Sequence, residues 1–361
     1  MRVLVVNAGS STLKLSMLDS DDTVSGSETI ELVVGGWDPV AVRGFLEGLP
    51  APDVVGHRVV HGGREFVEPV LLDAGVVERL AALTPLAPLH QPKALAGIGA
   101  ITEAVPGVPQ VACFDTAFHA SLGAEAFTYA VPLEWRERFG VRRYGFHGLS
   151  HAYVSGVAAE LTGGRRIVTA HLGAGASLAA VLEGRCVDTT MGFTPLEGLV
   201  MATRSGTVDP GMVLWLQREA GLGADEVAEG LERGGGLTGL AGTADMREVL
   251  AGVGRGEARS VLAFGVYVHR LRASVAAMAA ALGGLDVLVF TAGVGERSAP
   301  VRWAVAEGLG FLGVVVDRSV NEGVSGEVVE ISGAGASVRT LVVPTREDVQ
   351  IARGAREVVG V

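Results

Sequence analysis

Five short segments of this chain combine a charged or imidazole side chain with glycine, serine or threonine. They are residues 7–14, 57–63, 113–119, 143–151 and 203–210. Arginine binds phosphoryl and carboxylate oxygens through its planar fork, and a tight turn of glycine and serine exposes N–H groups that can hold phosphate oxygens. These segments therefore predict chemistry on a small anionic molecule.

Each segment also has an ordinary structural interpretation, and the residues alone leave it open. Residues 7–14 could be a simple hairpin turn, and His57 and Arg58 could lie solvated on an edge strand. Asp115 follows an apolar run and could face a cleft from a strand end or cap a helix. Arg204 could bind an anion or lie on the surface.

The histidines are unevenly distributed. His147 and His151 lie four residues apart, a spacing that raises the possibility of zinc. The glutamate of the HExxH motif is absent, and His147 precedes the predicted helix, so histidine ligation of a metal is disfavoured. Seven of the eight histidines fall within residues 57–171, and we expect them to line one polar cleft.

Length and composition restrict the class of protein. A chain of 361 residues is expected to form two domains. Its formal net charge of −11 argues against broad nucleic-acid binding, which needs a basic face. The most apolar stretch, residues 273–290, is interrupted by two glycines and an aspartate and does not suit a membrane span. The chain starts directly with a predicted strand, so we expect a cytoplasmic protein with no membrane partner.

Two glycine-turned hairpins are predicted from alternating apolar residues. A strand at 3–6 leads through a Gly/Ser turn to a strand at 13–17, and a strand at 167–170 leads through a second glycine turn to a strand at 176–182. The two turns are 164 residues apart, counting from Asn7 to His171. This repetition predicts a duplicated domain.

Helices alternate with further strands, which indicates the α/β class. Strands are predicted at 108–114 and 286–290. Helices are predicted at 152–161 after Ser150 as N-cap, at 210–218, at 300–307, and after a capping box at residues 345–348. A long helix at 258–282 is apolar nearly all round and is expected to be buried.

The six most informative motifs, taken together, resemble those of the acetate kinase family. They occur in the family's order at residues 7–11, 57–63, 114–119, 144–148, 203–206 and 293–296. The resemblance implies two duplicated actin-like (ribonuclease H-like) α/β domains with a nucleotide cleft between them, and a homodimer. The implied division is residues 1–119 plus 347–361 for the N-terminal domain, and residues 120–346 for a C-terminal domain that carries the nucleotide site and the dimer surface.

The resemblance also implies roles for individual residues. The catalytic residues fall on Arg58, Asp115, His147 and Arg204. The acetate site falls on Arg58, Val60, Leu89, Phe146 and Pro195. The nucleotide contacts fall on Lys14, His171, Leu172, Gly173, Ala174, Gly175, Asp245, Met246, Arg247, Gly293, Val294, Gly295, Glu296 and Arg297. A Mg²⁺ ion, replaceable by Mn²⁺, falls on Asn7 and Glu347.

Three positions depart from the family's usual pattern. Ala174 and Gln91 each stand where asparagine is usual, and so does Arg297. The change at Ala174 removes one side-chain hydrogen bond near the phosphates. These departures concern the nucleotide contacts more than the type of reaction.

The implied reaction is reversible phosphoryl transfer from ATP to the carboxylate of acetate, giving acetyl phosphate and ADP. A carboxylate is already ionised at pH 7, so no general base is needed and Asp115 is expected to position Mg²⁺ or an arginine. The nearest rival function is that of a propionate or butyrate kinase. A sugar or glycerol kinase, or a non-catalytic actin-like ATP-binding protein, would also have this class of fold.

Overall fold

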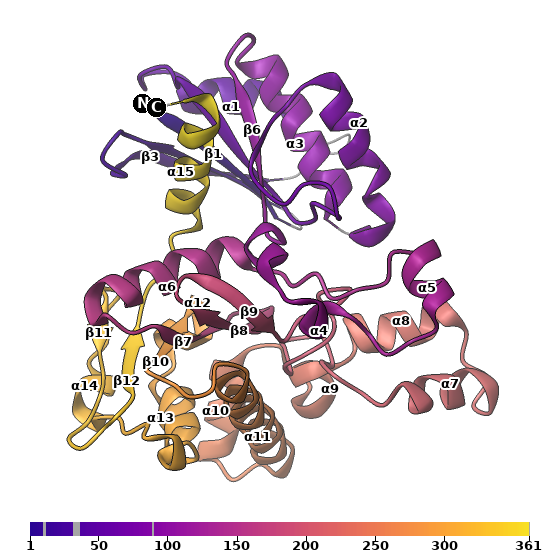
Figure 1. Cartoon of the computed structure of the whole chain (residues 1–361), viewed down its shortest axis with the longest axis vertical. Coiled ribbons are helices and arrows are strands. Elements are labelled where there is room, and N and C mark those ends of the chain that lie inside the picture. Colours follow the sequence, from indigo (N-terminus) through magenta and orange to yellow (C-terminus); the bar gives the residue numbers. More distant parts are fainter. Residues whose placement is uncertain (10–11, 32–36, 89, 361) are drawn as a thin grey trace. The chain divides into compact units, whose positions relative to one another are not determined.

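A computed structural model of the protein describes residues 1–9, 12–31, 37–88 and 90–360. The chain forms two compact units (Figure 1). The first contains Met1–Ala120, Phe146–Tyr153 and Arg346–Val361; the second contains Ser121–Gly145 and Val154–Thr345. This grouping places Phe146–Tyr153 in the first unit, whereas the division predicted from the sequence places these residues in the C-terminal domain. The predicted domain boundaries stay a prediction.

The first unit is built on a six-stranded sheet with the order β3-β2-β1-β4-β6-β5. The strand β1 is antiparallel to β2 and parallel to β4, which is in turn parallel to β6. The carboxyl ends of the parallel strands β1, β4 and β6 therefore lie side by side at one end of the sheet. The strands are β1 (Val3–Ala8), β2 (Thr12–Leu18), β3 (Val24–Glu31), β4 (Val54–Val59), β5 (Val70–Leu71) and β6 (Gln110–Phe114).

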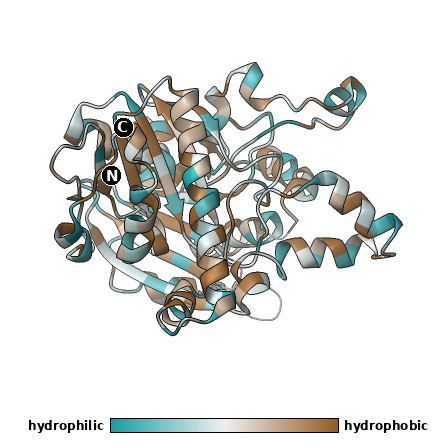
Figure 2. Cartoon of the chain, turned by 90° about the horizontal axis from the view of Figure 1, so that it is seen from below, coloured by the Kyte–Doolittle hydropathy of each residue, from teal (hydrophilic) through white to brown (hydrophobic). Residues whose placement is uncertain are grey.

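Alternating residues of these strands pack on opposite faces of the sheet. Leu4 and Val6 pack in a cluster with Val42 of α1 (Pro39–Leu46) and Ile101 of α3 (Gln91–Ala104). The other face packs against the last helix of the chain, α15 (Glu347–Val359), which lies beside the sheet in Figure 1. In Figure 2 the strands near the marked termini are mostly brown, because both of their faces are buried.

The remaining short elements of the first unit are α2 (Ala74–Ala82), η1 (Thr84–Leu86) and η2 (Ala117–Ser121). Helix α6 (Gly148–Thr162) begins in this unit and ends in the second.

The second unit repeats the topology of the first. Its six-stranded sheet has the order β11-β12-β10-β7-β8-β9. As in the first sheet, an antiparallel hairpin (β7 and β8) continues through two parallel strands (β10 and β12), and antiparallel strands close both edges. The predicted duplication is confirmed. The strands are β7 (Arg166–Leu172), β8 (Ala176–Leu182), β9 (Arg185–Thr189), β10 (Val287–Thr291), β11 (Val329–Glu330) and β12 (Arg339–Val342).

Helices complete the second unit. They are α4 (Ala124–Phe127), α5 (Leu133–Arg138), α7 (Pro210–Arg218), α8 (Ala224–Glu232), α9 (Gly236–Ala241), α10 (Met246–Gly254), α11 (Ala258–Ala281), α12 (Ala292–Arg297), α13 (Ala299–Glu307), η3 (Gly310–Leu312) and α14 (Arg318–Glu322). The predicted helix at 210–218 is confirmed, and Asp209 caps it by accepting a hydrogen bond from the N–H of Gly211 at 2.8 Å.

Helix α11 is not buried all round, so that prediction was wrong. It buries one face, which includes Ala263, Tyr267 and Leu271, while Val261 and Leu262 are 48% and 58% exposed. The apolar composition of α11 therefore does not mean that every face of the helix is buried. Among the described residues α11 is the one helix long and apolar enough to cross a membrane, a test that a core helix also passes.

One predicted helix start was also wrong. Ser150 lies inside α6, because Gly148 begins that helix two residues earlier. The last helix, α15, begins at Glu347, within the predicted segment 345–348, and its N-cap residue is Arg346, which makes no side-chain capping bond. The N–H of Thr345 donates to Glu296 at 3.0 Å.

The contact between α15 and the first sheet depends on a glycine in β4. A Cβ atom at Gly56 would lie 2.6 Å from Cγ2 of Ile351. We expect Gly56→Ala to lower the free energy of unfolding by about 1–3 kcal/mol through overpacking, as measured by urea titration. Gly99→Ala is the matched control, because its methyl group meets nothing within 4 Å and it lies exposed in α3. An equal loss of stability in both variants would contradict the packing explanation.

Candidate active site

Three polar side chains meet where the parallel strands of the first sheet end. Asn7 of β1 pairs with Arg58 of β4, and Asp115 directly follows β6, donating its N–H to the carbonyl of Val59 at 3.1 Å. Side chains alternate between the two faces of a strand. Asn7 follows Val3 and Val5 on the face that α15 covers, and the first residue of α15 is Glu347.

The guanidinium of Arg58 is the centre of this cluster. It donates to Asp115 from Nε at 3.0 Å to Oδ1 and from Nη2 at 2.6 Å to Oδ2. Its Nη1 donates to Oδ1 of Asn7 at 3.1 Å, and its Nε lies 3.9 Å from Oε2 of Glu347. The side chain of Asp115 is only 2% exposed. Arg58 therefore has a fixed, two-bonded orientation against a buried carboxylate.

Two carboxylates close to Arg58 determine its pKa and the net charge of the cluster. Burial alone would lower the pKa of the Arg58 guanidinium, but the charges of Asp115 and Glu347 outweigh that effect and hold this pKa above its ordinary value. One guanidinium and two carboxylates leave a formal charge of −1. Hard oxygen donors with net negative charge fit Mg²⁺, which needs only one or two carboxylates when it also binds phosphates. Glu347 and Asn7 are the donors that suit this ion.

A tight backbone contact joins Asp115 to the predicted catalytic histidine. His147 has a left-handed backbone (φ 58°), which is uncommon outside glycine. The next residue, Gly148, donates its N–H to the carbonyl of Asp115 at 2.8 Å, and a Cβ there would lie 2.3 Å from that oxygen. The glycine therefore allows the two chain segments to approach, and the contact fixes His147 beside Asp115.

Two predicted acetate-site residues of the first unit besides Arg58 are apolar and buried. Val60 is 8% exposed and Phe146 1%. The carbonyl of Phe146 hydrogen-bonds the His119 ring at 2.9 Å, and its own ring lies edge-on to that of His61 at 5.5 Å. Leu89 lies outside the described residues. These contacts hold Phe146 in place but do not test its predicted role.

Two of the predicted residues of the second unit lie together. Arg204 is half-buried and donates from Nη1 to the carbonyl of Pro195 at 2.9 Å. Burial lowers its pKa from the ordinary value, partly offset by the charge of Glu232. Arg204 makes no ion pair within 4 Å in the part of the chain that the structure describes. A half-buried arginine without a carboxylate partner is suited to an anionic ligand.

The loop that carries Pro195 is held by residues that the sequence analysis did not assign. Arg143 donates to Glu197 at 2.8 Å and also to three consecutive carbonyls, those of residues 189–191. The hydroxyl of Tyr129 donates to Glu197 as well. Burial is the main reason why the pKa of Tyr129 is raised. In the sequence, only the unusual run of two arginines before Tyr144 could have indicated these contacts with the loop.

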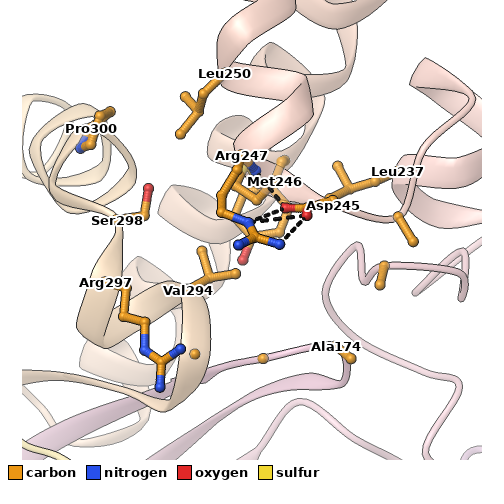
Figure 3. A pocket seen from close by; sticks show the side chains of 15 residues that line it. Ala174, Leu237, Asp245, Met246, Arg247, Leu250, Val294, Arg297, Ser298 and Pro300 are labelled. Carbon is orange, nitrogen blue, oxygen red and sulfur yellow. Dashed lines mark hydrogen bonds and ion pairs between the residues drawn. The ribbon is translucent and has the colours of Figure 1, made fainter.

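A cavity of about 570 Å³ lies within the second unit (Figure 3). It is lined by eight of the predicted nucleotide residues: Gly173, Ala174, Asp245, Met246, Arg247, Gly293, Val294 and Arg297. Seven further residues complete its wall: Ala202, Leu237, Ala244, Leu250, Tyr267, Ser298 and Pro300. Asp245 caps α10 and pairs with Arg247 at 2.5 Å, as Figure 3 shows. The geometry therefore brings three separate predicted segments together around one cavity.

The other predicted nucleotide residues do not line this cavity. His171 and Leu172 end β7 and are buried, and Gly175 lies in the turn, where it accepts a bond from Gly173 at 2.9 Å. Gly295 is buried in α12. Lys14 belongs to the first unit, where it is exposed on β2 opposite Asn7. Their contacts with a nucleotide stay predictions.

The carboxylate of Glu296, a residue of α12, accepts two hydrogen bonds from the main chain. Its Oε1 accepts from the N–H of Ala292 at 2.8 Å and from that of Thr345 at 3.0 Å. Arg302, which is 1% exposed, donates to the carbonyls of Gly295 and Glu296 at 2.9 and 2.8 Å. Burial lowers the pKa of Arg302 to about 10. These bonds fix α12 along the cavity, and nothing in the sequence pattern marked Arg302.

Gln91 belongs to the first unit, whereas this cavity lies within the second. Gln91 is fully buried in the first unit, where its Nε2 donates to the carbonyls of His61 and Leu80, each at 3.2 Å. Its side chain therefore has a structural role.

The histidines do not line one cleft, so that prediction was wrong. His57 lies on the opposite face of β4 from Arg58, is 2% exposed, and hydrogen-bonds Gln110 at 2.6 Å. Burial lowers the pKa of His57 to about 4 and that of His61 also to about 4. Within the described ranges no three His, Cys, Asp or Glu side chains are grouped to hold a metal ion. The two cysteines, Cys113 and Cys186, are free and buried.

Comparison with known proteins gives a consistent result. The Acetokinase family matches residues 44–353. The acetate kinase of Deinococcus deserti is 46% identical over 392 aligned positions, covering 99% of this chain and 98% of that protein. The crystal structure of Porphyromonas gingivalis acetate kinase has a TM-score of 0.90 at 38% identity, and that of a propionate kinase from Francisella tularensis has 0.92 at 33%. Both structures match over 99% of each chain.

The buried histidines predict a pH dependence of stability. Their folded-state pKa of about 4 lies below the ordinary value of 6.5, so the unfolded chain binds more protons between these values. The stabilising contribution is complete above pH 6.5 and is lost as the pH falls toward 4. We expect His57→Gln to reduce this loss in urea titrations at pH 7.5, 6 and 5. His269→Gln, at an exposed position, is the control; an identical slope in all three proteins would contradict the explanation.

Proposed function

This chain belongs to the Acetokinase family, as its motifs predicted, and we propose that it transfers the γ-phosphoryl group of ATP reversibly to the carboxylate of acetate. The products are acetyl phosphate and ADP. The match covers nearly the whole chain of curated acetate kinases and of their solved structures. The fold is the duplicated α/β arrangement described above.

The observation that carries the proposal is the pairing of Asp115 with Arg58. A hydroxyl acceptor, as in a sugar, must lose a proton, and an aspartate usually serves as the base. Here the only buried carboxylate of the cluster accepts two bonds from a guanidinium and is 2% exposed. Such a carboxylate is a poor proton acceptor. A carboxylate substrate needs no base, so this geometry favours acetate over a sugar.

The main obstacle to the reaction is electrostatic, because an anion attacks a polyanion. We assign Arg58, Arg204 and His147 to offsetting this repulsion and to stabilising the phosphoryl oxygens during in-line transfer. Arg204 supports this assignment, since its guanidinium has no carboxylate partner in the described residues. Asp115 then acts by orienting Arg58.

Glu347 and Asn7 would hold a Mg²⁺ ion, or Mn²⁺ in its place. The negative charge of the cluster and its oxygen donors support this assignment. When bound, the ion supplies positive charge to the phosphates of ATP. The chain's own contribution is to keep Glu347 and Asn7 in contact, at 3.4 Å, through the packing of α15 on the sheet.

Acetate is proposed to bind in an apolar site of small volume that includes Val60, Phe146 and Pro195, together with Leu89. A pocket of this kind discriminates by only about 1–3 kcal/mol per methylene. Propionate is therefore the second candidate substrate, and the similarity to a propionate kinase favours testing it.

We also propose that the protein is a cytoplasmic homodimer. Large apolar side chains are exposed on the second unit, among them Leu214 at 47%, Trp215 at 57% and Leu262 at 58%. Contiguous exposed apolar side chains mark interaction surfaces, and Leu214 and Trp215 are adjacent on α7. The proposed partner is a second copy of this chain.

The test is acyl phosphate formation from ATP and Mg²⁺ with acetate, propionate or butyrate, trapped with hydroxylamine. We expect product with acetate, less with propionate, and a loss of turnover on the order of 10³-fold in Arg204→Ala. Arg318→Ala, which removes a surface arginine that is 74% exposed, is the matched control and should retain turnover.

Each outcome of this assay discriminates between the proposals. Near-normal turnover in folded Arg204→Ala would contradict the role of Arg204. Faster turnover with propionate or butyrate would replace acetate as the substrate. No product with any of the three acids in folded protein would contradict the proposed function.

A further inference from the structure

Arg204 lies on a long irregular connection of the second unit. This connection runs from residue 190, directly after β9, to residue 209, directly before α7, and contains no helix or strand. Connections longer than about 12–15 residues without secondary structure are uncommon in compact units and usually carry function. An arginine on such a segment keeps one orientation only if other residues hold the segment in place.

The main chain and the side chain of Arg204 are held by different contacts. The main chain is anchored at the next residue, where the N–H of Ser205 donates to the carbonyl of Leu231 in α8 at 2.9 Å. The guanidinium is oriented by its Nη1, which donates to the carbonyl of Pro195 at 2.9 Å and lies 3.7 Å from Sδ of Met201. The direction in which the guanidinium points therefore depends on the position of Pro195.

Three side chains hold the loop on both sides of Pro195, and we call Arg143, Glu197 and Tyr129 the loop network. Arg143 is only 17% exposed, and its Nη2 donates to Glu197 at 2.8 Å. Its Nη1 lies 3.0–3.2 Å from the carbonyls of residues 189–191. The hydroxyl of Tyr129 donates to the same carboxylate of Glu197. The loop network thus joins the segment before Pro195 to the segment after it.

The loop network packs directly against the main chain of the loop. A Cβ atom at Gly192 would lie 1.8 Å from Oε2 of Glu197 and 2.1 Å from Oη of Tyr129. The N–H of Phe193 donates to the Tyr129 hydroxyl at 3.0 Å, and the carbonyl of Gly192 accepts from the N–H of Tyr144 at 3.0 Å. Because this packing leaves no spare room, loss of one member of the network should displace the loop.

We propose that the loop network positions Arg204 for phosphoryl transfer by fixing the carbonyl of Pro195, so that Arg143 is a positioning residue of the reaction. This inference rests on the proposed function, because it takes Arg204 as a group that stabilises the transferred phosphoryl group. Arg143 acts through the loop, since its own guanidinium is already bonded to Glu197 and to main-chain carbonyls. A misplacement of about 1 Å in such a site costs up to about 10²-fold in rate.

The first experiment measures kcat for acetyl phosphate formation and KM for ATP in the full chain and in Arg143→Ala. We expect kcat to fall about 10- to 100-fold, because the charge of Arg204 remains but its orientation is lost. KM for ATP should be unchanged. Arg143→Lys should lose less than Arg143→Ala, because an ammonium keeps the charge opposite Glu197 but cannot replace the planar fork. Tyr129→Phe, which removes a single hydroxyl, should also lower kcat, by a smaller factor.

Arg138→Ala is the matched control. It removes an arginine of the same unit that is 68% exposed beside Glu134, and kcat should be retained.

The second experiment introduces Arg143→Ala into the Arg204→Ala variant. If Arg143 acts through Arg204, the added substitution should lower kcat by less than about 3-fold, far less than it does in the unaltered protein. A residue that only stabilises the fold would lower kcat by the same factor in both backgrounds.

Equal factors in the two backgrounds, or an unchanged kcat in both Arg143→Ala and Tyr129→Phe, would overturn the inference and leave the proposed function intact. If Arg143→Ala fails to fold, Tyr129→Phe is taken through the same two backgrounds and decides the question. Absence of acetyl phosphate from the unaltered protein would contradict the proposed function itself.

Discussion

The pairing of Arg58 with the buried carboxylate of Asp115 organises the polar cluster of the first unit. Arg58 is held by two bonds to Asp115 and one to Asn7, from three strands that end at the same edge. If Arg58 were removed, the carboxylate of Asp115 would be an uncompensated buried charge, which costs several kcal/mol. Glu347 adds a second anion from the last helix of the chain, and the packing of that helix on the sheet brings it there.

The same pairing constrains the chemistry. Asp115 cannot both orient Arg58 and accept a proton, so a site built in this way is suited to an acceptor that is already ionised. Gly148 contributes by approaching the carbonyl of Asp115, which ties His147 to the cluster through the main chain. In the second unit, by contrast, Arg204 is a cation without a carboxylate partner among the described residues. It bonds to the carbonyl of Pro195, and the hydrogen bonds of Arg143 hold the loop that carries Pro195.

The sequence predicted what depends on local pattern. Alternating apolar residues predicted the two hairpins, and the repetition of the hairpins predicted the duplicated topology. The resemblance of six motifs to a known family also predicted functional roles for Asn7, Arg58 and Asp115. What the sequence missed depends on contacts between distant residues: the start of α6, the partners of Glu296, and the exposed face of α11. No local pattern encodes the two bonds by which Arg302 holds α12.

The central claim is that Asp115 acts through Arg58 and has no separate chemical role. A double-mutant cycle with Asp115→Asn and Arg58→Gln, read as kcat/KM for acetate in protein shown to be folded, tests it most directly. We expect strong non-additivity, with the double variant losing little more than the worse single variant. Losses that multiply across the two sites would show that Asp115 and Arg58 act independently and would contradict the account.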